Sequence, residues 1–237
     1  MIRSEVNTKQ LTFPVFLFLF FTLITNCTQK SDKKVIDWGS EYRKQGLVLV
    51  DTTANNISVN LRYSGPNNFV GKDVYGNLED AYLQAEALDK LYKAASLLKE
   101  DHPELELLIW DAARPRRIQQ LLWDTVDIPL TERSKYVANP ASGSIHNYGC
   151  AVDLTLIDSK GNPLDMGTDY DEFDEIAHID QEDELVHSNV LNSEQVKNRR
   201  ILRAVMMKAG FNTINSEWWH FDAFTREETK SRFAIVE

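Results

Sequence analysis

Cysteine is scarce in this sequence, because only Cys27 and Cys150 of the 237 residues carry a thiol. Two cysteines can form at most one disulfide, which is too few to hold a chain of this length together, so a disulfide scaffold is excluded. Basic residues are also the minority, with 26 Lys and Arg against 36 Asp and Glu and a formal net charge of −10. This balance argues against a protein that binds nucleic acid through a Lys/Arg-dense face.

Apolar residues, in contrast, are plentiful: 43% of the chain is hydrophobic and 10% is aromatic. Such a composition can supply a sizeable core, which argues against global disorder. At roughly 100–200 residues per domain, the length predicts one domain or at most two small ones. We see no internal repeat and no low-complexity linker after residue 34, so we expect one domain over 35–237.

The longest apolar run, Leu11 to Ile24, follows the basic residues Arg3 and Lys9. The run is shorter than the ~20 residues that a membrane-spanning helix needs. It is typical of the hydrophobic region of a secretory signal. We therefore expect a signal peptide over 1–26 and an exported, extracytoplasmic product.

Cys27 stands directly after this signal, where a bacterial lipoprotein carries its lipidated cysteine. Ile24 and Asn26 depart from the Leu and the small residue usual before that cysteine, so a plain cleaved signal is the alternative. We predict lipidation of Cys27, a polar tether over 27–34 and anchorage to a membrane surface.

Hydrophobic periodicity predicts alternating helices and strands in the rest of the chain. Helices are expected over 79–99, 115–123 and 196–209, and strands over 105–110, 151–157 and 218–224. This order indicates an α+β fold, with helices flanking a small central sheet that we expect to be antiparallel.

Three short segments hold most of the residues that could perform chemistry: 111–115, 144–153 and 217–220. Two histidines and one carboxylate, such as His146, His220 and Asp153, form the three-ligand set of a catalytic zinc site with a fourth position open. A further carboxylate that does not bind the metal can then move a proton.

Convergence of these residues requires two irregularities in the backbone. His146 lies seven residues before Asp153, so a continuous strand would direct the two side chains to opposite faces; Gly149 allows a bend between them. Glu217 and His220 lie three residues apart and would also face opposite ways on a flat strand. A turn or bulge at Trp218–Trp219 is therefore required.

Less specific interpretations exist for the same residues. A lone histidine near an apolar strand is more often a hydrogen-bonded core or surface residue than a ligand. The Glu-x-x-His spacing of Glu217 and His220 also recurs at Glu175–His178 and Glu184–His187, which raises a di-iron carboxylate bundle as a rival. That rival fails because the chain lacks four long amphipathic helices.

Taken together, these segments resemble the D-alanyl-D-alanine dipeptidases, the zinc peptidases known from vancomycin resistance and cell-wall recycling. The combination Ser-x-His-x-x-Gly-x-Ala-x-Asp with a downstream Glu-x-Trp-His is far more specific than either part. The matching stretches run in family order along the chain: 68–72, 110–117, 144–156, 166–167, 198–200 and 217–220.

The resemblance implies one zinc ion per chain, held by His146, Asp153 and His220. It implies that Glu217 acts as general base and then general acid, and that Arg114 stabilises the oxyanion of the tetrahedral intermediate. The implied fold places the zinc site at the sheet and is shared with the signalling domain of Hedgehog proteins.

The resemblance also implies residues that bind the dipeptide. Asp171 matches a family aspartate that binds the free amino group, although Asp169 and Asp174 lie close enough to compete. Ser144 matches a residue thought to help bind substrate. A family tyrosine near Gly76 has no clear equivalent, since Asn77 stands opposite it and Tyr75 lies two residues away. Cys150 is expected to be a buried neutral thiol.

The expected function is hydrolysis of the D-alanyl-D-alanine dipeptide, in peptidoglycan turnover or salvage because the signal directs the chain out of the cytoplasm. A D,D-carboxypeptidase that acts on longer wall peptides is an alternative. A non-catalytic zinc-fold binding lipoprotein is another, and the presence of both Glu217 and Arg114 argues against it. Neither a nucleic acid nor a protein partner is predicted.

Overall fold

The computed structural model describes residues 35–237 with the exception of residue 54. The predicted signal peptide, the tether and Cys27 lie outside the described residues, and they remain predictions. Within the part that is described, no helix combines the length and the apolarity needed to cross a membrane.

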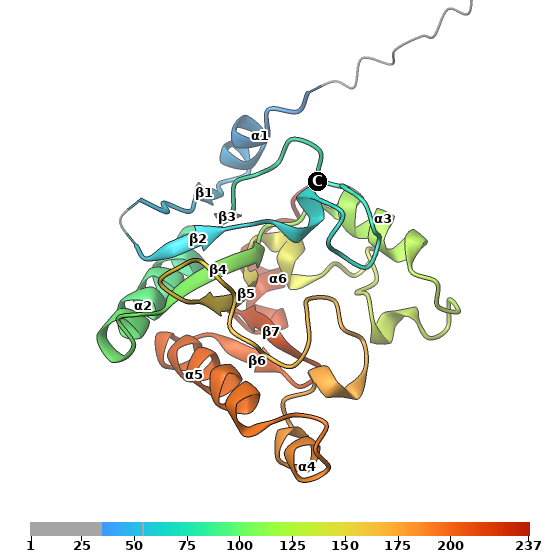
Figure 1. The fold of residues 1–237 in the computed structure, drawn as a ribbon. Coiled ribbons are helices and arrows are strands. Elements are labelled where there is room, and N and C mark those ends of the chain that lie inside the picture. The colour runs from blue at the N-terminus through green and yellow to red at the C-terminus, as the bar shows by residue number, and fades with distance from the viewer. Residues whose placement is uncertain (1–34, 54) are drawn as a thin grey trace, which may run out of the picture. The chain divides into compact units, whose positions relative to one another are not determined.

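A five-stranded sheet lies at the centre of this part of the chain, in the order β2-β4-β5-β7-β6 (Figure 1). Its strands are β2 (Ile57–Val59), β4 (Glu106–Asp111), β5 (Ala151–Ile157), β6 (Asn212–Ile214) and β7 (Glu217–Asp222). A separate two-stranded sheet pairs β1 (Val48–Leu49) with β3 (Tyr82–Leu83). Every residue of β5 is buried, as expected for the middle strand of a covered sheet.

The expected α+β architecture is confirmed, with one correction to the direction of the strands. Three of the sheet's neighbouring pairs are antiparallel, but β2 and β4 run parallel. A parallel pair requires a long crossover, which helix α2 supplies here between the two strands. The short apolar runs carried no signal of strand direction, and β2 was not predicted at all.

Six α-helices of the described residues accompany the sheet: α1 (Trp38–Lys44), α2 (Ala85–Asp101), α3 (Arg116–Thr125), α4 (Glu182–His187), α5 (Ser193–Ala209) and α6 (Arg226–Arg232). The two long helices, α2 and α5, pack against each other and on the central strands (Figure 1). Leu91 and Leu98 of α2 and Leu202 and Met206 of α5 are completely buried there. The apolar stripes read from the sequence thus cover one face of the sheet.

Local signals explain where these helices begin and end. Asn192 caps α5 by accepting from the amides of Glu194 and Gln195, and Gly210 follows the helix in the left-handed conformation, at φ 103°. Pro115 is the N-cap of α3 instead of its first residue. The helix expected from residue 79 begins only at Ala85, because Tyr82 and Leu83 pair with β1.

Candidate metal centre and active site

Strand register places three polar side chains side by side on the central sheet. Asp111 of β4 pairs with Asp153 of β5, which pairs with His220 of β7. Residues directly opposite one another in neighbouring strands project to the same face. The pairing shifts between Ile109 and Asp111, so Trp110 forms a bulge that turns Asp111 toward Asp153.

His146 reaches the same face from a short 3-10 helix, Ile145–Tyr148, just before β5. Gly149 ends this helix in the left-handed conformation, at φ 67°, and the chain reverses there as the sequence predicted. His146 Nδ1 lies 2.8 Å from the carbonyl oxygen of Ala112. A carbonyl can only accept, so Nδ1 carries the proton and the Nε2 lone pair faces the site.

His220 depends on an irregularity in β7. Thr213 pairs with Phe221, but Ile214 pairs with Glu217, so a bulge spans the intervening residues of β7. The turn or bulge predicted at Trp218–Trp219 is therefore present, and Glu217 and His220 both reach the site. His220 Nε2 lies 2.9 Å from Asp222 Oδ1, which orients the ring with Nδ1 toward Asp153.

The three predicted ligand atoms form a compact triangle. His146 Nε2 lies 3.2 Å from Asp153 Oδ1 and 3.1 Å from His220 Nδ1, and the third side measures 2.9 Å. A tetrahedral zinc ion with bonds of about 2.0–2.1 Å requires ligands separated by about 3.3 Å. The triangle thus fits a small divalent cation, and all three residues are buried.

Electrostatics also favour a cation at this position. Burial alone would lower the pKa of His220, but the carboxylates of Asp222 and Asp153 outweigh it and raise that pKa well above its usual range. Burial would raise the pKa of Asp153, yet the neighbouring imidazoles hold it far below the ordinary value. The donor set therefore attracts positive charge, as protons or as a metal ion.

Glu217 and Arg114 border the triangle. Glu217 Oε2 lies 3.9 Å from His220 Nδ1, and burial raises the pKa of the Glu217 carboxyl. Arg114 is buried, and its Nη2 lies 3.6 Å from Asp153 Oδ2. Both side chains line the same cavity as the three ligand residues.

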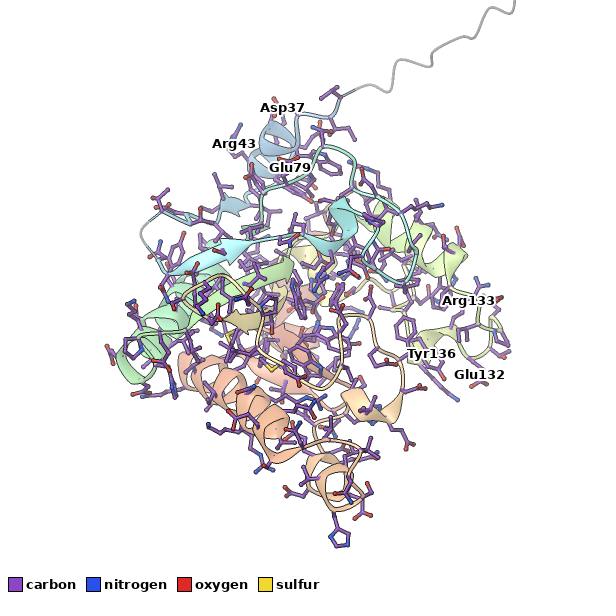
Figure 2. The ribbon with its side chains drawn as sticks, in the orientation of Figure 1. Asp37, Arg43, Glu79, Glu132, Arg133 and Tyr136 are labelled. Atoms are coloured by element: carbon purple, nitrogen blue, oxygen red, sulfur yellow. The ribbon has the colours of Figure 1, made fainter. Side chains whose placement is uncertain are left out.

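The cavity has a volume of about 180 Å³. This is below the roughly 300–1,000 Å³ of pockets for drug-sized ligands. The rings of Tyr136 and Phe173, whose centroids lie 5.5 Å apart, are among the groups that line it. Figure 2 labels Tyr136 on the same segment as Glu132 and Arg133, which follows α3.

Asp171 lines this cavity, whereas the competing aspartates do not. Its carboxylate accepts from the Tyr63 hydroxyl at 3.0 Å and from the Phe69 amide at 3.2 Å. Burial raises the pKa of Asp171 to about 7. Asp169 is exposed and pairs with Arg62, and Asp174 is also exposed.

Ser144 lines the cavity as well and caps the 3-10 helix that carries His146, its Oγ accepting from the His146 amide at 3.4 Å. Neither candidate for the unmatched family tyrosine reaches the cavity. Tyr75 donates to Asp111 at 2.6 Å, and Asn77 donates to the carbonyl of Ile36. Tyr63 is the tyrosine beside Asp171.

Several polar residues around the site carried no signal in the sequence. Tyr170 donates to Asp153 Oδ2 at 2.9 Å and so holds the oxygen that faces away from the imidazoles. Asp222 orients His220, and Asp111 binds Arg114. Asp111 is the first residue of the segment 111–115 that the sequence marked, but only the fold reveals that it binds Arg114.

Cys150 is completely buried, and burial raises the pKa of its thiol to about 12. A thiol in this environment stays neutral, as expected from the sequence.

A family model described as D-ala-D-ala dipeptidase matches residues 43–235. The chain belongs to this family. Its members, the M15 peptidases, are metal-dependent enzymes, and His146, Asp153 and His220 form a group that could bind such a metal ion.

Curated relatives carry the same description. The chain is 36% identical over 167 residues to the D-alanyl-D-alanine dipeptidase of Escherichia coli K12, covering 70% of this chain and 79% of that protein. It is 30% identical over 194 residues to the enzyme of the same name from Enterococcus faecium, covering 74% and 90%. The dipeptidase of Streptomyces coelicolor is 31% identical over 189 residues, covering 74% and 90%.

Proposed function

We propose that this M15 peptidase hydrolyses D-alanyl-D-alanine to two molecules of D-alanine with one zinc ion. The observation that carries the proposal is the convergence of a three-atom ligand triangle, a free carboxylate and a buried arginine in one small cavity. The names of the family and of its curated relatives support the substrate.

His146 Nε2, Asp153 Oδ1 and His220 Nδ1 would hold the zinc ion, with Ala112, Tyr170 and Asp222 fixing the three ligands from behind. When bound, zinc supplies a Lewis acid that polarises a carbonyl and makes water a better nucleophile. Three protein ligands, two imidazoles and one carboxylate, with the fourth position left open are typical of catalytic zinc.

Glu217 is the proposed general base and acid. Its carboxylate lies at the edge of the triangle and is not part of it, which leaves it free to accept a proton from the attacking water. The same carboxyl group would then donate that proton to the nitrogen of the departing D-alanine. Its partial exposure, 30% of the side chain, fits a group that faces the cavity.

Arg114 is the proposed oxyanion group. It faces the cavity beside Asp153, where its guanidinium could donate to the carbonyl oxygen as negative charge develops. Asp171, assisted by Tyr63, would bind the free ammonium group of the dipeptide at the other end. Ser144 would bind substrate nearby.

The position of Asp171 supports a dipeptide over a longer peptide. Burial raises the pKa of Asp171 to about 7, so a cationic partner would stabilise its ionised form, and a free dipeptide brings one. An internal residue of a wall peptide has an amide at this position and no charge. A D,D-carboxypeptidase would need this end of the cavity to be open.

Hydrolysis of two separate substrates by the zinc-loaded protein tests the proposal. We expect rapid release of D-alanine from D-Ala-D-Ala and little from a wall pentapeptide that ends in D-Ala-D-Ala. Zinc measured on the same samples should approach one ion per chain. Cleavage of the pentapeptide alone would contradict the dipeptidase assignment, and binding without hydrolysis of either would indicate a non-catalytic protein.

We also propose that the chain is exported and anchored through lipid on Cys27, where it would act in salvage or turnover of peptidoglycan fragments. The support is the basic start, the apolar run 11–24 and the cysteine that follows it. Metabolic labelling with radioactive palmitate should mark the wild type and leave Cys27→Ser unlabelled. Labelling of both, or of neither, would contradict the lipid anchor.

A deletion strain tests the physiological role. If the enzyme acts in salvage, deletion leaves the sensitivity to vancomycin unchanged. An increase in sensitivity would instead indicate a resistance function.

A further inference from the structure

Asp111 is a completely buried carboxylate at the edge of the candidate active site. Its Oδ2 accepts from Arg114 Nε at 2.7 Å and from Arg114 Nη2 at 2.5 Å. Its Oδ1 accepts from the Tyr75 hydroxyl at 2.6 Å. Tyr75 therefore fixes one oxygen of Asp111, and the other oxygen holds the arginine.

The hydrogen bonds of Arg114 leave two donors free. A guanidinium carries five N–H groups. Asp111 takes one from Nε and one from Nη2, and Gln119 Oε1 takes one from Nη1 at 3.0 Å. The two that remain, one on each terminal nitrogen, take part in no hydrogen bond within the described residues, and Arg114 lines the cavity.

The backbone of Arg114 is tied to the metal-binding segment. Its amide donates to the His146 carbonyl at 3.0 Å, and its carbonyl accepts from Asn147 at 2.7 Å. Main chain and guanidinium are thus held independently, the first by the 144–149 segment and the second by Asp111. A small displacement of a catalytic group can lower the reaction rate by a large factor. The two attachments limit such displacement of the Arg114 guanidinium.

The bulge at Trp110 brings Asp111 opposite Asp153, so two carboxylates face each other across the strands. Arg114 Nη2 lies between them, 2.5 Å from one and 3.6 Å from the other. A carboxylate at position 111 therefore keeps the guanidinium from collapsing onto Asp153, where it would compete with a metal ion for the same ligand.

We propose that Asp111 is a positioning residue that aims the two free donors of Arg114 at the carbonyl oxygen of the substrate. Tyr75 and Gln119 complete the frame. The inference rests on the oxyanion role proposed above for Arg114, and it adds a residue that acts on the reaction through that arginine. Asp111 Oδ2 also lies 3.7 Å from His146 Nδ1, so zinc content is measured in every variant.

A double-mutant cycle on the zinc-loaded enzyme tests this inference. We expect Arg114→Ala to lower kcat by roughly 10²–10³-fold. Asp111→Asn, which keeps the shape and removes the charge, should lower kcat by roughly 10–100-fold with KM and zinc content near wild type. Combined with Arg114→Ala, Asp111→Asn should lower kcat no further.

A tetrahedral phosphinate analogue of the dipeptide gives a second readout. Its affinity should fall in Asp111→Asn by about the same factor as kcat, since transition-state interactions are lost and ground-state binding is kept. Tyr75→Phe removes one hydroxyl and no charge. It should lower kcat by several-fold when Arg114 is present, and it should have no effect on kcat in the Arg114→Ala background. This milder variant decides the question if Asp111→Asn does not fold.

Glu182→Gln is the matched control, because Glu182 is buried and binds Arg203 through both oxygens, at 2.9 and 2.7 Å, but does not line the cavity. It should lower the melting temperature and leave kcat unchanged. An undiminished effect of Asp111→Asn in the Arg114→Ala background, loss of zinc, or an unchanged kcat would overturn the inference. Wild-type kcat in Arg114→Ala alone would instead refute the proposed role of the arginine.

Discussion

The spacing Glu-x-x-His occurs on helix α4, at Glu184–His187, and on strand β7, at Glu217–His220. The two regions differ in secondary structure and in the burial of the histidine. On a helix, residues three apart share a face, so local geometry favours α4 as a site. Yet Glu184 and His187 are exposed. On a flat strand the same residues would face opposite ways, and it is β7 that carries the candidate site.

The difference arises from neighbouring strands. The bulge in β7 brings Glu217 and His220 to one cavity, and the register with β5 sets His220 beside Asp153. Helix α4 packs on α5 and its histidine, His187, is exposed to solvent. A short motif therefore gains chemical meaning from the backbone irregularity and the strand beside it.

The largest expected effect separates the two glutamates. Glu217→Gln should lower kcat for D-Ala-D-Ala by about 10²–10⁴-fold, because the general base is lost while zinc is retained. Glu184→Gln should have wild-type kcat. Steady-state kinetics with parallel zinc analysis checks both, and near-normal turnover in Glu217→Gln would show that the base is another residue.

The next effect concerns the ammonium end of the cavity. Asp171→Asn should raise KM by roughly 10–100-fold, because a hydrogen bond between two charged groups is lost. Asp174→Asn removes an exposed charge only three residues away and should leave KM within about twofold. Equal effects of the two substitutions would mean that Asp171 has no specific contact with the substrate.

The pH dependence of substrate binding follows from the same residue. The pKa of Asp171 is raised to about 7 by burial, so its carboxylate is increasingly protonated as the pH falls through that value. KM should therefore rise toward acid pH, and this rise should vanish in Asp171→Asn. A wild-type profile of KM against pH that is flat between pH 6 and 8 would contradict the assignment.

The smallest effect tests the bend that brings His146 to the strand. At Gly149, a Cβ would lie 2.4 Å from Leu47 Cδ2 at a φ of +67°. Gly149→Ala should therefore destabilise the fold by about 1–3 kcal/mol and lower zinc affinity. Gly161 has φ +82° with nothing within 4 Å, so Gly161→Ala isolates the backbone strain alone. Chemical denaturation of both variants measures the difference.

Much of the candidate site could be predicted because most of its residues lie in three short segments, two of which carry their own backbone constraint. Gly149 indicated a bend before Asp153, and the spacing of Glu217 and His220 predicted a turn or bulge between them. Strand β5 was predicted with its observed bounds, since its apolar run is long enough to fill a central strand. Both long helices followed from their apolar stripes.

The remainder depends on contacts between distant segments. Tyr63 lies 108 positions from Asp171 in the chain, and Tyr75 lies 36 from Asp111, so no local pattern connects them. The parallel strand β2 has only three residues, too few for a periodicity. Packing decides where short strands form and which distant residues hydrogen-bond to the site residues, and a single sequence carries no local signal of either.

X-ray absorption at the zinc edge of the loaded protein tests the central claim most directly. The account predicts two imidazole nitrogens and oxygen donors at about 2.0–2.2 Å, with no sulfur. It also predicts an unchanged spectrum in His187→Ala and loss of bound zinc in His220→Ala. A sulfur ligand, or a spectrum that changes in His187→Ala, would contradict a metal site built from His146, Asp153 and His220.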